Sequence, residues 1–367
     1  MKKKRVWVLV VSIALVLIVV GGCATQAETG TKTAQQITVT DTLGRTVELT
    51  GNAQKIVATG VGALRLYTYV GAVDKIAGIE GIDQKSSIGK PYVIVNPEFA
   101  NLPTIGAGGP NSSPDPEQIL KVEPDVIFTT TATDTATADE LQNKTGIPVI
   151  ALSSGSTGLF DETLYQSLTI IGQVMGTEAR ATEVVDFIKA YEADLKQRTT
   201  GIDEAAKVTS YVGALGSKGA QGIESTRAQY PPFIAVDAKN VVDQTGKSGS
   251  MMIDKEQLLQ WNPQKIFIDF DGIEKVKADL SANPEYYASL NAFKDNEVYM
   301  ILPYILYGTN IEVAIADAYS IGKVLYPEQF SDVEPGDIMD EASEELLGAK
   351  VYDQMVADYG TFGKFAQ

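Results

Sequence analysis

The stretch DPEQILKVEPDVIF at residues 115–128 is matched by DKEQLLQWNPQKIF at residues 254–267, with seven of fourteen positions identical. In each copy an aspartate stands where a helix N-cap belongs and a glutamine follows three residues later, as in a capping box. The first copy also has a proline at the first helical position. A proline in each copy then ends the helix before a short apolar strand. Each copy therefore predicts one helix and one strand of a parallel sheet, at equivalent places in two lobes.

The segments around the two copies predict the rest of each lobe. ITVTDTLGRTVELTG (37–51) alternates apolar and polar residues about a turn, which predicts a β-hairpin. From KIVATG onward, strands alternate with helical patterns, and a second such series starts at KVTSYVGAL. This order is typical of doubly wound, Rossmann-like α/β lobes with parallel sheets. We divide the chain into a signal segment (1–22), a flexible tether (23–36), an N-terminal α/β lobe (37–176), a connecting helix (177–200), and a C-terminal α/β lobe with a helical tail (201–367).

The connecting helix is predicted from TEARATEVVDFIKAYEADLKQ, which starts at Thr177. Thr177 is a suitable N-cap and Gly201 follows the end of the pattern. A helix of this length spans about 30 Å, long enough to join two lobes. Helical spacing places one apolar face along the helix, made of Ala181, Val184, Val185, Ile188, Tyr191 and Leu195.

The N-terminus has the form of an export signal. Four basic residues precede an apolar run from Val6 to Val20, which is short for a spanning helix, and Gly21-Gly22-Cys23 follows. Val-Gly-Gly-Cys resembles the lipobox of bacterial lipoproteins, in which this cysteine is the lipidated first residue. An uncut anchor is the alternative, and both interpretations place the rest of the chain outside the cytoplasmic membrane.

The composition excludes several classes of site. The chain has no histidine, and its one cysteine is Cys23, so Ser-His-Asp catalysis and imidazole or thiolate metal sites are ruled out. Its formal net charge of −17 argues against nucleic acid as a partner. We expect no catalytic residues, no bound metal and no cofactor.

Loops at the predicted strand ends are the candidates for ligand contact, because ligands bind at that edge of such sheets. The long loop that carries Arg227 is the strongest, and Arg227 is the first choice for a charged contact. Asp269 and Asp271 follow a strand, where capping of the loop is the simplest role. The set expected at these loops is Gly62, Ala63, Arg65, Thr130, Glu224, Arg227, Tyr230, Tyr304 and Tyr307.

Glu117 and Glu256 stand at the same helical position in the two copies. A carboxylate in a first helical turn stabilises the helix dipole by about 0.3 to 1 kcal/mol, which explains either residue alone. The presence of the same residue in both lobes favours a shared function at the mouth of the cleft.

The hairpin, KIVATG, LYTYVGAVDKIAGI and the repeated unit together resemble the periplasmic binding proteins of importers for iron-siderophore, haem and vitamin B12. The resemblance covers roughly residues 37–327. It implies two α/β lobes joined by one long helix, a monomer without enzymatic activity, and a metal-chelate or corrinoid ligand in the cleft. It adds three first-lobe residues to the expected ligand contacts, namely Tyr92, Gly109 and Asn111. It also implies that Glu117 and Glu256 dock on an ABC permease dimer, which works with its ATPase, while Cys23 anchors the protein in the membrane. Ala53 replaces the proline usual before KIV, and the tail is longer than in the family.

Three alternatives remain open from the sequence. The same fold also carries oxyanions such as molybdate or tungstate, which helix N-termini and Arg227 would hold. A tethered ligand sensor without a permease is the second alternative. An extracellular hydrolase that uses Asp269 and Asp271 is the third, and it lacks a nucleophile beside a base.

Overall fold

The structure is a computed structural model and describes residues 36–109, 111–155, 159–216 and 219–366. The signal segment 1–22 and the lipidation residue Cys23 lie outside the described residues. Within the described ranges, no helix is long and apolar enough to cross a membrane.

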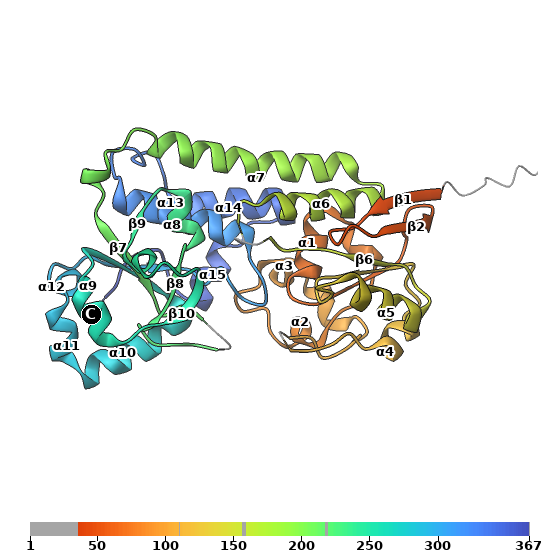
Figure 1. Ribbon diagram of the computed structural model, residues 1–367, viewed down its shortest axis with the longest axis horizontal. Coiled ribbons are helices and arrows are strands. Elements are labelled where there is room, and N and C mark those ends of the chain that lie inside the picture. The colour runs from red at the N-terminus through yellow and green to blue at the C-terminus, as the bar shows by residue number, and fades with distance from the viewer. Residues whose placement is uncertain (1–35, 110, 156–158, 217–218, 367) are drawn as a thin grey trace, which may run out of the picture. The chain divides into compact units, whose positions relative to one another are not determined.

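Two parallel sheets form the centres of two lobes (Figure 1). In the first lobe the strand order is β4-β3-β5-β6, and in the second it is β9-β7-β11-β12, with β13 added antiparallel to β12. The strands of the first sheet are β3 (Ile56–Thr59), β4 (Ile76–Gly78), β5 (Val126–Thr129) and β6 (Val149–Ala151). Those of the second are β7 (Thr209–Gly213), β9 (Lys239–Asn240), β11 (Lys265–Asp269), β12 (Val298–Ile301) and β13 (Gly363–Lys364).

The two sheets share one topology. The four parallel strands of each sheet can be counted in chain order, as β3, β4, β5 and β6 in the first and β7, β9, β11 and β12 in the second. In each sheet the first of these strands lies between the second and the third, and the fourth lies beside the third. The repeated sequence supplies the third strand in both, β5 and β11. The prediction that the copies are equivalent units of two doubly wound α/β lobes is therefore confirmed. The strands run parallel, but the second strand is added on one side of the first and the third on the other. The order of the strands therefore reverses between the first and third strands, and this switch point is where such sheets bind ligands.

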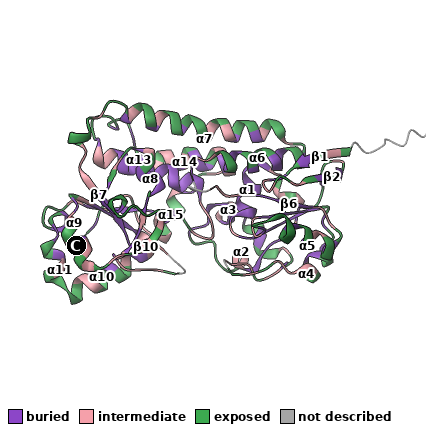
Figure 2. Cartoon of the chain, in the orientation of Figure 1, coloured by how far each residue is buried: buried purple, intermediate pink, exposed green. Residues whose placement is uncertain are grey.

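Helices cover the sheet of the first lobe on both faces. The strands β3, β5 and β6 are buried at every position, as expected for a parallel sheet between two helical layers. Every residue of α1 is buried as well, which Figure 2 shows at the centre of the lobe. The helices are α1 (Ala63–Val70), α2 (Gly81–Lys85), α3 (Pro91–Ile94), α4 (Pro116–Lys121), α5 (Thr135–Thr145) and α6 (Glu162–Met175).

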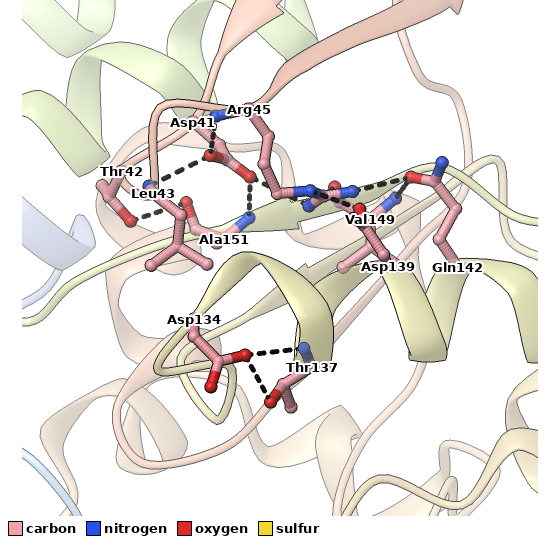
Figure 3. A network of polar contacts seen from close by, with 10 residues as sticks. All are labelled: Asp41, Thr42, Leu43, Arg45, Asp134, Thr137, Asp139, Gln142, Val149 and Ala151. Carbon is pink, nitrogen blue, oxygen red and sulfur yellow. Dashed lines mark hydrogen bonds and ion pairs between the residues drawn. The ribbon is translucent and has the colours of Figure 1, made fainter.

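The N-terminal hairpin of β1 (Gln36–Thr40) and β2 (Thr46–Thr50) is fastened to the first lobe by Arg45 (Figure 3). Its guanidinium donates to Asp41 at 3.0 Å, to Asp139 at 2.8 Å and to the carbonyl of Val149 at 3.1 Å. The carboxylate of Asp41 is fully buried and also accepts from the hairpin backbone. The buried pair with Asp41 orients the guanidinium within the hairpin, and its bonds to Asp139 and Val149 fix the hairpin against α5 and β6.

The helix α7 (Glu178–Thr199) joins the two lobes and lies along α6 and α13 (Ile311–Leu325) (Figure 1). Its cap residues are Thr177 and Thr200, and Gly201 has a φ of 85°. Five of the six residues predicted for its apolar face are buried, and Val185 is half-buried. The prediction of a single long connecting helix is thus confirmed.

The second lobe adds a small antiparallel sheet and several short helices. The strands β8 (Ser225–Ala228) and β10 (Gly249–Met252) pair beside the main sheet. The remaining helices of this lobe are α8 (Pro231–Ala235), α9 (Lys255–Trp261), α10 (Ile273–Ala282), α11 (Pro284–Ser289) and α12 (Asn291–Lys294).

The C-terminal tail contacts both lobes, whereas the sequence led us to expect helices on the second lobe alone. Its helix α14 (Pro335–Leu347) packs on α13 and also on α1 and α3 of the first lobe. Arg180 of α7 donates to Glu345 of α14 at 2.6 Å. The short helix α15 (Tyr352–Asp358) leads to the edge strand β13. One hydrophobic cluster runs through both lobes as a result, with Tyr67, Phe267 and Met339 among its members.

Candidate functional site

The switch point of the first lobe opens into a hollow of about 480 Å³ between the ends of β3 and β5. An adjoining hollow of about 350 Å³ shares Val61, Thr130 and Thr133 with it. Lys144 and Glu140 at the rim form an ion pair of 2.6 Å with each other. The lining is therefore rich in hydroxyl groups and has little net charge. The hydroxyl residues of the larger hollow are Ser112, Ser113, Thr130, Thr131, Thr133 and Thr137.

Hydrogen bonds hold the loops after β3 and β5 together. The Thr130 hydroxyl donates to the carbonyl of Val61 at 3.0 Å, and the hydroxyls of Thr59 and Thr129 lie 3.1 Å apart. Gly60 has a φ of 92°, and a Cβ there would lie 2.6 Å from the Thr131 methyl carbon. Only glycine allows this close approach, so the predicted contact Thr130 is placed at the hollow by its packing against the Gly60 loop.

Arg65 and Tyr92, both predicted ligand contacts, are buried beneath a loop of the second lobe. The guanidinium of Arg65 donates to the carbonyls of Leu306 at 2.8 Å and Tyr307 at 3.0 Å, and lies over the Tyr92 ring at 4.5 Å. The Tyr92 hydroxyl donates to Asp83. These side chains hold the two lobes together and do not line the hollows.

Gly62 and Ala63 lie at the start of α1, where the sequence suggested amides for an anion. Gly62 has a φ of 78°, and a Cβ built on Gly308 of the second lobe would lie 2.9 Å from the Gly62 Cα. Ala63 is fully buried. The backbone of Gly308 therefore covers this helix N-terminus.

Of the predicted contacts Gly109, Asn111 and Tyr307, only Gly109 lines the first-lobe hollow. The Gly109 amide donates to the Tyr307 hydroxyl at 2.9 Å. Tyr307 in turn donates to Glu80 at 2.6 Å. Asn111 is exposed. Glu80 was not among the predicted residues, although it directly follows β4 and so stands at the ligand-binding edge of the sheet.

Arg227 in β8 differs from the other described arginines, because its side chain has neither a hydrogen bond nor an ion pair within the described residues, and its Nε is buried. Predicted Glu224 is half-buried and lies 3.7 Å from Lys255. The arginines with partners are Arg45, Arg65, Arg180 and Arg198. Arg227 thus remains available for an anionic or hydrogen-bonding group, as the sequence suggested.

Tyr230 and Tyr304 are brought together in the second lobe with ring centroids 5.7 Å apart. Both are buried, and neither hydroxyl has a hydrogen-bond partner among the described residues. Burial raises the pKa of both phenols, while the charge of Arg227 acts in the opposite direction. The two tyrosines therefore pack together with unpaired hydroxyls, and the charge of Arg227 acts on both.

Two buried carboxyl groups lie near these tyrosines. Burial raises the pKa of Asp269 to about 8 and that of Asp317 well above its ordinary value. Asp269 accepts from the amide of Asp271 at 2.8 Å, which confirms the interpretation that it caps its loop. In the part of the chain that is described, no group of three or more acidic, His or Cys side chains is placed to hold a metal ion.

Glu117 and Glu256 are both exposed, and among the described residues neither forms an ion pair or a side-chain hydrogen bond. A lysine lies near each in sequence, but Lys121 donates to Gln118 and Lys255 to Asp279. Both glutamates therefore keep their charge available to a partner.

Of the predicted capping boxes, only the side-chain N-cap of the first copy is formed among the described residues. Asp115 accepts from the amides of Glu117 and Gln118, each at 3.1 Å, while the Asp254 side chain caps nothing. The predicted helix start is nevertheless found in both copies, because α4 and α9 begin directly after these aspartates.

Comparison with known proteins agrees with this architecture. A relative in Bacillus subtilis (strain 168), an uncharacterized ABC transporter substrate-binding lipoprotein, YvrC, is 20% identical over 338 residues, which cover 90% of this chain and 99% of that protein. The iron-uptake system-binding protein of the same organism is 27% identical over 202 residues, which cover 52% of this chain and 59% of that protein. The molybdate-bound periplasmic binding protein MolA of Haemophilus influenzae has the same fold, with a TM-score of 0.67 and 22% sequence identity. The match covers 85% of this chain and 98% of that chain.

A family model for periplasmic binding proteins matches residues 56–304, from β3 to the loop after β12. This match covers the two sheets with the same topology, the hollow at the first switch point and both copies of the repeat. The chain belongs to the periplasmic binding protein family.

Proposed function

We propose that the protein is the substrate-binding component of an ABC importer, anchored outside the cytoplasmic membrane through lipidated Cys23. It captures a polar chelate of a metal, such as a ferric siderophore or haem, or a corrinoid, and delivers it to a permease dimer that works with an ATPase. The observation that carries the proposal is the pair of unpaired glutamates, Glu117 and Glu256, at the same helical position of two equivalent units. An exposed carboxylate on each lobe gives a basic partner two matched contacts.

The ligand class is supported by the composition of the cleft. A chelator already supplies the metal ligands, so the protein needs only hydrogen-bonding groups for the periphery of the complex. The hydroxyl-lined hollow of the first lobe and Arg227, Tyr230 and Tyr304 of the second supply such groups. The B. subtilis relative named for iron uptake supports the same ligand class.

The docking proposal is tested with Glu117→Ala/Glu256→Ala in cells that contain the intact importer. We expect uptake to fall at least about tenfold, because each charged contact contributes roughly 1.5 to 3 kcal/mol when it is well formed. Ligand binding by the purified protein should be unchanged, since neither glutamate lines a hollow.

The chain offers a closely matched control. Glu98 and Glu285 are exposed, stand directly after a proline in a first helical turn, and lie one in each lobe. Glu98→Ala/Glu285→Ala should leave uptake as in the wild type. Equal uptake by the two double variants would refute docking through Glu117 and Glu256.

An oxyanion carrier is the second candidate function, and Arg227 is the observation that favours it, because its side chain has no protein partner within the described residues and its charge acts on two unpaired phenols. The fold neighbour that binds molybdate supports the same candidate. A thermal-shift panel of molybdate, tungstate, ferric siderophores, haemin and cobinamide separates the two candidates. A ligand at about 100 times its dissociation constant adds roughly 2.7 kcal/mol to the free energy of unfolding, which raises the melting temperature. A shift with the oxyanions alone would exclude the chelate proposal.

A further inference from the structure

The loop from Tyr304 to Asn310, which we call the strap, leaves the second lobe after β12 and contacts the first lobe at several points before α13 begins. The carbonyls of Leu306 and Tyr307 accept from Arg65, as described above. The Asn310 side chain donates to the carbonyl of Gly89 at 2.9 Å. The strap is therefore bound to the first lobe through both backbone and side chains.

One phenol and one carboxylate form the centre of this contact. Glu80 is only 3% exposed, and its Oε2 accepts both from the Tyr307 hydroxyl at 2.6 Å and from the Gly60 amide at 3.1 Å. The Tyr307 oxygen accepts from the Gly109 amide at 2.9 Å. Gly60 and Gly109 belong to the two loops that border the first-lobe hollow. A side chain of the second lobe thus helps to position both loops of a site in the first.

The backbone of the strap is strained at the same place. Tyr307 has a φ of 50°, which is uncommon for a residue with a side chain, and Gly308 follows with a φ of 100°. A Cβ on Gly308 would lie 2.6 Å from the Arg65 Nη1. The contacts that Tyr307 makes in the first lobe hold it in this conformation, since such strain persists only where the surroundings over-determine it.

From these contacts we infer that Tyr307 and Glu80 form a latch, which holds the two lobes together and preorganises the loops around the first-lobe hollow. Tyr307 is a positioning residue in this arrangement and acts through Gly109 and Glu80. Where the protein serves as a binding component, as proposed above, opening of the latch sets how fast the hollow releases its ligand, because preorganised loops retain ligand longer.

Spin labels at exposed positions on either lobe test the latch. We would introduce Asn143→Cys on α5 and Ala278→Cys on α10 in the full chain, with Cys23→Ser so that only these two positions are labelled. In Tyr307→Phe we expect the distribution of distances between the two spin labels to be longer and broader than in the same labelled chain without this substitution. Tyr326→Phe is the matched control, because among the described residues its hydroxyl bonds only to the carbonyl of Asp237 within the second lobe, at 3.0 Å.

Hydrogen exchange supplies a second, local readout. The Gly109 amide loses its acceptor in Tyr307→Phe, and we expect it to exchange roughly 3- to 10-fold faster, which corresponds to one ordinary hydrogen bond. Glu80→Gln keeps an oxygen that accepts from Tyr307, so the distances between the spin labels in this variant should resemble those of the wild type. The increase in the exchange rate of the Gly109 amide should be smaller than in Tyr307→Phe.

Unchanged distances together with unchanged exchange at Gly109 in Tyr307→Phe would overturn the inference. Changes of equal size in the distances and in Gly109 exchange in Tyr326→Phe would also overturn it. They would show that loss of any hydrogen-bonded tyrosine hydroxyl loosens the structure, without a role for the latch. Neither measurement uses a ligand or a permease. Failure of the latch would therefore leave the proposed transport function standing, and failure of the docking test would leave the latch standing.

Discussion

Arg65 and Arg227 show how two arginines of one cleft come to have different roles. Arg65 is 1% exposed and donates to two carbonyls of the strap, while the Arg227 side chain has no protein partner in the described part of the chain. Both follow glycine-containing loops at strand ends, and the sequence predicted that both contact the ligand. The difference arises because residues 306 and 307, far away in the chain, cover only the first of them.

Substitution of these arginines should separate the two roles. Arg65→Ala leaves two buried carbonyls without a donor, and we expect the free energy of unfolding to fall by at least about 2 kcal/mol. Arg227→Ala removes no hydrogen bond or ion pair to the described residues, so the loss should stay below about 1 kcal/mol. Urea unfolding of both variants checks this. Equal losses would show that Arg227 has a structural role as well.

Asp269 should make stability depend on pH. Its folded-state pKa of about 8 lies above the ordinary value near 3.8 because the carboxyl group is buried. The folded protein therefore holds this proton more tightly than the unfolded chain. Its stabilising contribution is complete below about pH 4 and is lost as the pH rises through 8, with a slope of up to roughly 1.4 kcal/mol per pH unit.

Asp269→Asn removes that dependence, because the amide oxygen still accepts from Asp271 and the side chain does not ionise. Relative to the wild type, the variant should gain stability between pH 5 and pH 8 in denaturant titrations, and the difference should level off above pH 8. A stability difference that stays constant over this range would show that Asp269 does not titrate as its burial predicts.

At the scale of elements, the two copies of the repeat form the same helix start by different means. The Asp115 side chain accepts two amide hydrogen bonds at the start of α4, whereas the Asp254 side chain accepts none at the start of α9. At α9 the neighbouring Lys255 donates instead to Asp279 of α10, at 2.6 Å. The local pattern thus determined where each helix begins, and a contact between helices supports the second.

The aspartates should therefore differ in their contribution to stability. Asp115→Ala removes a working N-cap and should cost about 0.5 to 2 kcal/mol. Asp254→Ala removes no hydrogen bond from its side chain and should cost only a few tenths of a kcal/mol. Thermal unfolding of the two variants checks this comparison, and a larger cost at Asp254 would contradict it.

At the scale of the whole molecule, the tail makes one cooperative unit out of two lobes. The helix α14 packs on α13 and on α1, and the largest hydrophobic cluster includes residues of both lobes. A second cluster, which contains Leu258, is confined to the second lobe. We therefore expect a single calorimetric unfolding transition for the wild-type protein.

A buried residue of the tail should consequently affect both lobes. Met339→Ala in α14 leaves a cavity that should cost about 2 to 5 kcal/mol. Amide exchange should rise in α1 of the first lobe as well as in α13. Leu258→Ala, of similar chemistry, should raise exchange in the second lobe only. Confinement of the Met339→Ala effect to α13 and α14 would show that the lobes are not coupled through the tail.

Local patterns in the sequence were sufficient for much of the fold. Helix starts, the alternation of strands and helices, and the apolar face of α7 depend on residues within a few positions of one another, and each was predicted. The repeat also indicated equivalent units, which the common strand order confirms. Of the residues that line the hydroxyl-rich hollow, Thr130, which follows β5, and Gly109, in the loop before α4, were among the predicted ligand contacts, whereas Ser112, Ser113 and Thr133 were not singled out.

The sequence by itself determined the class of the protein, since the periodic burial of apolar residues and the duplicated unit specify two α/β lobes and a connecting helix. Only the tertiary structure decided which polar residues remain available. Arg65 and Tyr92 are buried because the strap, which follows them by more than two hundred residues, packs on them, while Arg227 has no such cover. Burial and hydrogen bonding between distant segments depend on how whole elements pack, and no local pattern contains that information.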